Sequence, residues 1–186
     1  GSLLGFLAAT MGGWVDQVLS RFVDVVISIP TLIFALIVLS STGTSIFALV
    51  TVIAIIYAMP VYRIARAVAM DIEVMDYVEA ARLRGEGLWW IMRKEILPNA
   101  LTPLAAEFGL RFCFVFLLIS GLSFLGLGLQ PPLADWGAMV RDNGGGIAWG
   151  FMHPLVPATC IALLTIGINL IVDSVVQKAS GLREDH

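Results

Sequence analysis

The chain has 186 residues, of which 59% are hydrophobic and 13% are charged, and its formal net charge is -3. Soluble domains are about 45–50% apolar and about 25% charged, and a soluble core of this size could not bury so much apolar surface. The composition, with a mean hydropathy of +0.92, excludes an ordinary soluble domain and predicts a membrane protein. Cys113 and Cys160 lie in apolar runs without a nearby Cys/His cluster, so both are predicted to be buried, reduced packing residues.

Five apolar runs are predicted to be helices. A bilayer core about 30 Å thick needs about 20 apolar residues in helical form, and polar breaks in the sequence separate the runs 3–11, 16–41, 45–62, 100–129 and 154–176. The first run is short and is expected to lack its N-terminal part. In the second, Pro30 is predicted to cause a kink, because proline removes a backbone hydrogen bond. The expected fold is all-α: one polytopic transmembrane helical bundle over residues 1–186, with about five membrane helices.

The basic residues are distributed unevenly between the connections. Residues 63–94 hold six Lys and Arg, Arg21 adds one, and Lys178 and Arg183 add two, so nine of the 11 basic residues lie in connections that alternation places on one side. Arg141 is the basic residue expected on the other side. Because Lys and Arg accumulate in cytoplasmic loops, the asymmetry predicts the orientation of the whole bundle.

This orientation puts residues 63–99 and the C-terminus in the cytoplasm and makes the loop 130–153 external. The external loop is rich in turn-forming Gly and Pro, and its two tryptophans suit a membrane interface. Its NGGG stretch, residues 143–146, is predicted to be a flexible turn, with contact to a substrate-delivering binding protein as the alternative.

The stretch EAARLRGEGLWWIMRKEILP, residues 79–98, is the most polar part of the chain. Between Asp71 and Pro98 there are six acidic and four basic residues, so the segment is not a polybasic lipid-binding patch. Helical spacing of apolar residues predicts one short amphipathic helix before Gly85 and a second after it, which Pro98 should end. Periodicity alone leaves two interpretations open: a loop that lies on the membrane surface, or a segment that is pushed by a partner.

The spacing within this stretch resembles the signature EAA-x3-G-x9-I-x-LP of permease subunits of ABC importers, with Glu95 at the position of Ile. The blocks 12–32, 76–104 and 121–140 are similar to the dipeptide/oligopeptide (peptide/nickel) permease family, and in particular to its C-type second permease. The signature residues are Glu79, Ala80, Ala81, Gly85, Leu97 and Pro98.

The resemblance implies a type I ABC importer permease fold, in which the EAA loop, here 71–98, forms coupling helices that seat in a separate ATP-binding subunit, with Glu79 and Gly85 central to the contact. The implied partners are a second related permease, two ATP-binding subunits, an extracytoplasmic substrate-binding protein and the lipid bilayer. The chain itself would be a non-catalytic subunit of a prokaryotic cytoplasmic (inner) membrane and would hold no cofactor, since ATP binds to the partner subunits. Short peptides are the default cargo, and nickel chelates, opine-like compounds and oligosaccharides stay open. Family members usually have a further helix and an external segment upstream.

Two pairs of polar residues within apolar runs are candidates for the substrate pathway. Glu107 and Arg111 are four residues apart, in the order that favours a helical ion pair. Asn169 and Asp173 have the same spacing near the end of the last run. Charges within membrane segments usually face a protein interior or an aqueous cavity, so each pair has a structural alternative: bundle stabilisation for the first, and a helix-end or interhelical contact for the second.

Two other classes of protein are weaker alternatives. An ion-coupled secondary transporter should show an internal inverted repeat, and no convincing repeat is visible. An intramembrane serine protease could use Ser120-Gly121, but it needs a base at the same depth, and neither His153 nor His186 is placed for that role.

Overall fold

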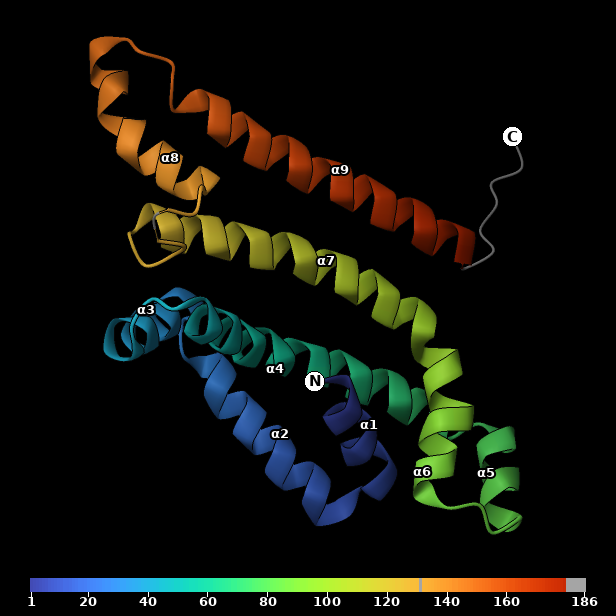
Figure 1. Ribbon diagram of the computed structural model, residues 1–186. Coiled ribbons are helices and arrows are strands. Elements are labelled where there is room, and N and C mark those ends of the chain that lie inside the picture. The colour runs from blue at the N-terminus through green and yellow to red at the C-terminus, as the bar shows by residue number, and fades with distance from the viewer. Residues whose placement is uncertain (131, 180–186) are drawn as a thin grey trace. The chain divides into compact units, whose positions relative to one another are not determined.

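The computed structural model describes residues 1–130 and 132–179, and every regular element in these ranges is a helix (Figure 1). The predicted C-terminal tail with Arg183 lies outside the described residues, as does the side chain of Lys178. The elements in chain order are α1 (Ser2–Met11), α2 (Gly13–Ser28), α3 (Thr31–Thr42), α4 (Ile46–Glu73), α5 (Asp76–Leu83), α6 (Leu88–Ile91), η1 (Met92–Ile96), α7 (Leu97–Phe124), α8 (Trp136–Asn143), η2 (Gly144–Trp149) and α9 (Leu155–Ala179).

All five predicted apolar runs are helical, and three helices in the described ranges are long and apolar enough to cross a membrane. These are α4, the continuous helix Leu88–Phe124, and α9 over Leu155–Gln177. The pair α2 and α3 passes the same test as one broken span, which raises the number to four. The first run, α1, has 10 residues and falls short of the roughly 20 that a bilayer core requires.

The predicted kink at Pro30 is instead a complete break, with α2 and α3 bent by 85°. α2 ends at Ser28, and Ile29 is extended with φ -82° and ψ 126°. A residue that precedes proline is pushed out of the helical region by the proline ring, so the helix stops one residue earlier. Pro30 then starts α3, since its carbonyl accepts the Phe34 N–H at 3.0 Å.

The prediction that Pro98 ends a helix is wrong. The helix that begins at Leu88 continues to Phe124, with a π-helical turn at Met92–Ile96. In this turn the Leu97 N–H donates to the Met92 carbonyl, five residues back. A proline normally collides with the carbonyl four residues before it, and a widened turn makes room for its ring. The amide of Asn99 compensates further, because Nδ2 donates to the Glu95 carbonyl at 2.6 Å.

Two other predicted boundaries shift. The third run was expected to end at Tyr62, but α4 continues to Glu73, so Arg63 and Arg66 lie on a helix and not in a loop. The fourth run was expected to reach Leu129, but α7 ends at Phe124. Its end is a glycine turn in which Gly126 has φ 87° and the Leu127 N–H donates to the Leu122 carbonyl at 2.8 Å, a Schellman-type ending that needs a left-handed residue.

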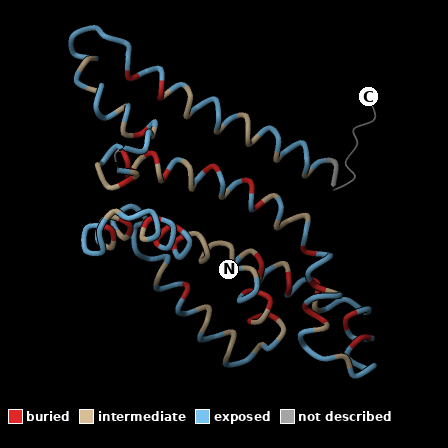
Figure 2. Tube along the Cα trace, in the orientation of Figure 1, coloured by how far each residue is buried: buried red, intermediate tan, exposed pale blue. Residues whose placement is uncertain are grey.

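The chain divides into two compact units, and the first consists of 1–29, 56–108 and the described part of 175–186. Its core joins α1, α4, α5, α6, the π-helical turn and the start of α7; the buried positions are visible in Figure 2. α1 lies directly against α4, since a Cβ on Gly5 would meet the Tyr62 carbonyl oxygen at 2.7 Å and the Arg66 nitrogen at 2.8 Å. The members of the core are Phe6, Ala9, Ala65, Ala69, Ile72, Val78, Ala81, Ile91, Met92, Ile96 and Ala100.

The second unit consists of 30–55 and 109–174. Within it α7 and α9 pack closely, because a Cβ on Gly109 would lie 2.1 Å from Val172. Cys113 is buried and its Sγ lies 3.7 Å from the Thr165 carbonyl, which agrees with the predicted packing role. Cys160 is only half-buried, so the prediction of full burial is wrong for it, although both thiols are free.

Residues 136–149 of the predicted external loop form two short helices, which corrects the expectation of a flexible NGGG turn. Asp135 caps α8 by accepting the Ala138 N–H at 3.1 Å, and Gly144–Trp149 forms the 3-10 helix η2. α8 packs on α7, since a Cβ on Gly137 would lie 2.2 Å from the Ser120 carbonyl oxygen. Ser120, the nucleophile of the protease alternative, is therefore a packing position between two helices.

Candidate functional site

The EAA segment folds as two helical arms joined by a tight turn. The first arm, α5, has the sequence DYVEAARL, with Asp76 and Glu79 in its first turn and Arg82 in its last. This charge order is favourable, because carboxylates near a helix N-terminus and cations near its C-terminus oppose the helix dipole. The second arm is α6 with its π-helical continuation, and it leads without a break into α7.

Gly85 makes the turn between the arms. Its φ is 82°, a left-handed conformation that costs a non-glycine residue about 1–2 kcal/mol. The Glu86 N–H donates to the Ala81 carbonyl at 3.2 Å, and the Gly85 N–H donates to the Arg82 carbonyl at 2.9 Å. These two bonds define a Schellman motif with glycine at its left-handed position. The glycine of the EAA signature is therefore required by the local backbone.

The signature residues divide between the interior and the surface. Ala81 is completely buried in the core of the first unit, beside Val78 and the second arm. The remaining signature residues are exposed, and, apart from Gly85 and its chain neighbours, no atom of the described residues lies within 4 Å of the place where a Gly85 Cβ would be. The turn is therefore exposed, while the buried side chain of Ala81 fixes the adjacent helix in the core of the first unit. The exposed members are Glu79, Ala80, Gly85, Leu97 and Pro98.

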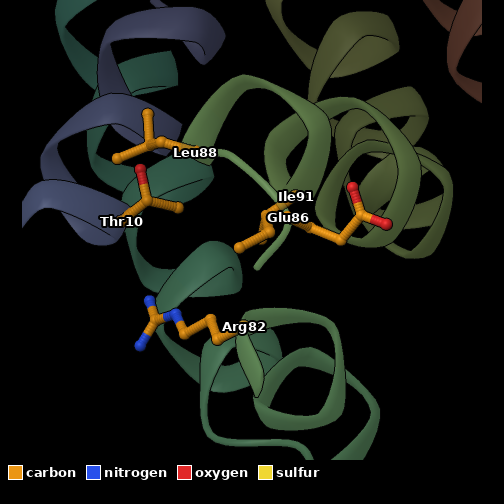
Figure 3. A pocket seen from close by; sticks show the side chains of 5 residues that line it. All are labelled: Thr10, Arg82, Glu86, Leu88 and Ile91. Atoms are coloured by element: carbon orange, nitrogen blue, oxygen red, sulfur yellow. The ribbon is translucent and has the colours of Figure 1, made fainter. Parts of the chain in front are cut away.

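Further contacts hold the first arm in place. Arg82 forms an ion pair with Glu73 at the end of α4, and the Arg84 guanidinium lies 5.9 Å from the centre of the Trp90 ring. A hollow of about 280 Å³ beside the turn is lined by Thr10, Arg82, Glu86, Leu88 and Ile91. Figure 3 shows that the charged ends of Arg82 and Glu86 point in different directions, so the hollow does not form a convergent ligand site.

A polar ladder between α2 and α4 was not predicted from the sequence. One of its ion pairs joins Asp24 to Arg63. Arg66 makes a bidentate contact with Asp16, in which Nη2 donates to Oδ2 at 2.5 Å. Ser20 lies between the two ion pairs, with its Oγ 2.9 Å from the Tyr62 hydroxyl and 3.2 Å from Asp16 Oδ1. A signal was present: the α2 side of the ladder recurs at 16, 20 and 24, which is one helix face.

The pathway candidates lie on α7 and α9. Glu107 is buried with 6% exposure. Arg111 is half-buried and its guanidinium lies 5.6 Å from the centre of the Phe114 ring, a cation–π distance. On α9, Asn169 is half-buried and Asp173 is exposed. The contact between Gly109 and Val172 places Arg111 and Asp173 at similar levels of the packed helix pair.

A metal site is not indicated. Within residues 1–130 and 132–179, no three His, Cys, Asp or Glu side chains gather as a metal site would require. The expectation that the chain binds no cofactor stays a prediction.

Apolar helices of membrane-spanning length, with a charged two-armed turn packed in the core of the first unit, indicate a multi-pass membrane protein. Residues 1–179 match the family model of the binding-protein-dependent transport system inner membrane component, and the chain belongs to this family. Membership does not support the ion-coupled alternative.

Relatives of this chain are named as transport permeases. It is 35% identical over 176 residues to the probable D,D-dipeptide transport system permease protein DdpC of Escherichia coli, covering 94% of this chain and 59% of the relative. It is 34% identical to the di/tripeptide transport system permease protein DppC of Pseudomonas aeruginosa (93% and 57%) and 30% identical to the glutathione transport system permease protein GsiD of Pectobacterium atrosepticum (93% and 58%). The chain thus spans less than three fifths of the length of these relatives.

Proposed function

We propose that this chain is the membrane-spanning part of a permease subunit in an ATP-driven importer, that it forms half of the translocation pore, and that its EAA segment receives the force from ATP-binding subunits. The observation that carries the proposal is the Gly85 turn, which exposes Glu79 and Ala80 while the adjacent Ala81 is buried. An exposed carboxylate beside an open glycine turn can accept charge-assisted hydrogen bonds from basic groups of a partner.

The packing of the first unit explains how a push on the turn would reach the membrane. Both arms share one core with α4 and α1, and close-packed cores transmit displacement because they contain few voids. The Arg82–Glu73 pair adds a second link from the first arm to the end of α4. The Asp16–Arg66 pair then connects α4 to α2. A movement of the turn is therefore expected to move α1, α2 and the end of α4 together.

The proposed setting is a prokaryotic cytoplasmic membrane, with the EAA segment and the C-terminus in the cytoplasm and the loop 130–153 outside. The concentration of basic residues in 63–94 supports this orientation. The proposed partners are a second related permease, two ATP-binding subunits, which bind the ATP, and an extracytoplasmic substrate-binding protein. Relatives named for D,D-dipeptide, di/tripeptide and glutathione transport support short peptides as the class of cargo.

For the pathway, we propose that Arg111 and Asp173 approach the translocated solute. Opposite charges at similar levels of the packed α7–α9 pair would suit the two ends of a zwitterionic peptide. Glu107 and Asn169 are proposed as their supporting neighbours, one helical turn away on the same helices. The test is to remove the charges singly, as Arg111→Gln and Asp173→Asn, and to compare uptake of zwitterionic and capped peptides.

The test of the coupling contact uses cysteine crosslinking in the full-length subunit, coexpressed with its ATP-binding subunits, after Cys113 and Cys160 are replaced by alanine. Leu83→Cys is the probe, because Leu83 is 84% exposed and lies beside the turn. Phe47→Cys is the matched control, since Phe47 is 82% exposed at the start of α4. We expect nucleotide-sensitive crosslinks to the ATP-binding subunits from position 83 alone. Free reaction of Leu83→Cys with water-soluble reagents in the assembled complex, without crosslinks, would overturn the proposal.

A further inference from the structure

A ledge of exposed apolar side chains precedes the spanning helix α9. We call residues 147–156 the apolar ledge. Four of its large side chains are strongly exposed within the second unit: Ile147 at 58%, Trp149 at 82%, Phe151 at 58% and Met152 at 71%. Contiguous apolar exposure of this kind marks contact with a protein, a ligand or a membrane.

The ledge is continuous with a membrane span. Leu155 and Val156, its last two residues, are exposed at 47% and 66% and form the first turn of α9. Only 6% of the apolar window of α9 is buried within the chain. The segment 143–172, which contains the ledge and most of α9, carries no Asp, Glu, Lys or Arg. The polar side chain within the ledge is the exposed imidazole of His153, whose ring meets that of Phe151 edge to face at 5.7 Å between centroids.

The chemistry of the exposed residues fits the bilayer boundary. Tryptophan is enriched where membrane meets water, because its ring is apolar and its indole N–H needs a hydrogen-bond partner. The backbone of η2 is self-bonded, since the Gly150 N–H donates to the Ile147 carbonyl at 3.0 Å and the Phe151 N–H to the Gly146 carbonyl at 2.9 Å. Internal bonding reduces the cost of placing a backbone segment in an apolar medium.

From these observations we infer that the apolar ledge binds the lipid bilayer, with Trp149 at headgroup level and Phe151 and Met152 among the upper acyl chains. The ledge thereby fixes the depth at which α9 begins. A shallow apolar hollow of about 360 Å³, lined by Met152, Leu155, Val156, Thr159 and Cys160, lies along the first turns of α9 and is the place where a single acyl chain of a phospholipid would pack.

The other tryptophan of the loop provides a matched comparison. Trp136 is 37% exposed, and its ring meets Phe116 edge to face at 6.1 Å between centroids. It belongs to α8, whose first turn packs on α7. Trp136 is therefore held by protein contacts, whereas Trp149 is 82% exposed.

The test measures tryptophan fluorescence of the full-length subunit in its assembled complex, reconstituted into phosphatidylcholine vesicles. The first variant retains Trp149 and the second retains Trp136, and in each the other tryptophans are changed to phenylalanine. The partner subunits contain no tryptophan. The vesicles contain phosphatidylcholine brominated either near the top or near the end of its acyl chains. Bromine quenches on contact. We expect several-fold stronger quenching of Trp149 by the top-brominated lipid than by the end-brominated lipid, and weaker quenching of Trp136 by either.

Quenching of Trp149 by aqueous iodide without quenching by bromolipid would overturn the inference in favour of a water-facing surface. Protection from both quenchers would overturn it in favour of a protein partner, such as a second permease or a binding protein. A second measurement, spin-label accessibility, avoids the multiple tryptophan changes. A nitroxide is attached at Ile147→Cys in a background without Cys113 and Cys160. If the site lies in lipid, the nitroxide should collide more often with oxygen, which concentrates in the bilayer, than with a water-soluble nickel complex. Neither measurement depends on ATP or on transport. A failure of the lipid-binding inference can therefore be distinguished from a failure of the proposed coupling role.

Discussion

The substitution Gly85→Ala isolates the backbone role of the EAA glycine. The residue has φ 82° in a Schellman motif, and a Cβ there would meet no atom within 4 Å. The cost of alanine is therefore conformational and not steric, about 1–2 kcal/mol. This energy corresponds to a factor of about 5–30 in the equilibrium ratio of the bent to the unbent turn. Uptake by the full-length complex should fall measurably, by up to this factor, while the amount of assembled complex falls much less.

Two variants make this prediction specific. Gly43→Ala introduces backbone strain outside the EAA segment, since Gly43 has φ 86° and ψ 168°, a region open essentially to glycine alone, and no described atom lies within 4 Å of a Cβ there. It should lower the thermal midpoint of the purified subunit at least as much as Gly85→Ala does and leave coupled transport nearly intact. Gly85→Asn tests the cause of the loss, because asparagine tolerates the left-handed conformation better than alanine does.

The measurements are peptide uptake into proteoliposomes and the ATPase rate that accompanies it. If the bend is what matters, Gly85→Asn retains most of the uptake that Gly85→Ala loses. Equal loss with both residues would show that a partner packs against the bare glycine. The reasoning would be refuted if Gly85→Ala kept full uptake, or if Gly43→Ala lost as much uptake as Gly85→Ala.

Five further substitutions test the packing of the first unit. Asp16→Ala removes one partner of a partly buried bidentate ion pair and should destabilise the subunit by about 1–3 kcal/mol. Asp24→Ala removes one partner of a more exposed ion pair and should cost at most about 1 kcal/mol. Thermal unfolding in detergent measures both changes in stability. Gly5→Ala should lower the yield of folded subunit, because the new Cβ would collide with the backbone of α4. Ala81→Glu should prevent folding, since the site is completely buried, while Ala80→Glu, at an exposed site, should leave folding intact and reduce crosslinking to the ATP-binding subunits.

Each of these expectations has a contrary result. Equal shifts for Asp16→Ala and Asp24→Ala would mean that the bidentate geometry adds no stability. Normal yield with Gly5→Ala would mean that α1 is not fixed against α4. Gly121→Ala is the control for helix glycines, because no atom lies within 4 Å of a Cβ there, and alanine is the better helix former by about 1 kcal/mol. A folded Ala81→Glu subunit would contradict the assignment of Ala81 to the core.

The sequence by itself determined the class of protein and the existence of its long apolar helices. Uncharged apolar runs have few alternatives to helices, because a membrane-embedded backbone must satisfy its own hydrogen bonds. The EAA spacing located the candidate site, and Gly85 indicated a turn, since glycine is the residue that adopts a left-handed conformation without cost. These properties are local, and a residue and its near neighbours suffice to predict them.

Only the tertiary structure decided how the elements end and which faces meet. Pro98 lies within a continuous helix because a π-helical turn absorbs its ring, and sequence rules alone favour a helix end there. Ala80 and Ala81 are identical residues, yet one is exposed and the other completely buried. Asp16 and Arg66 are 50 residues apart in sequence and meet because α2 lies along α4. Each of these outcomes depends on the position of a distant helix, so no window of neighbouring residues contains the information that fixes it.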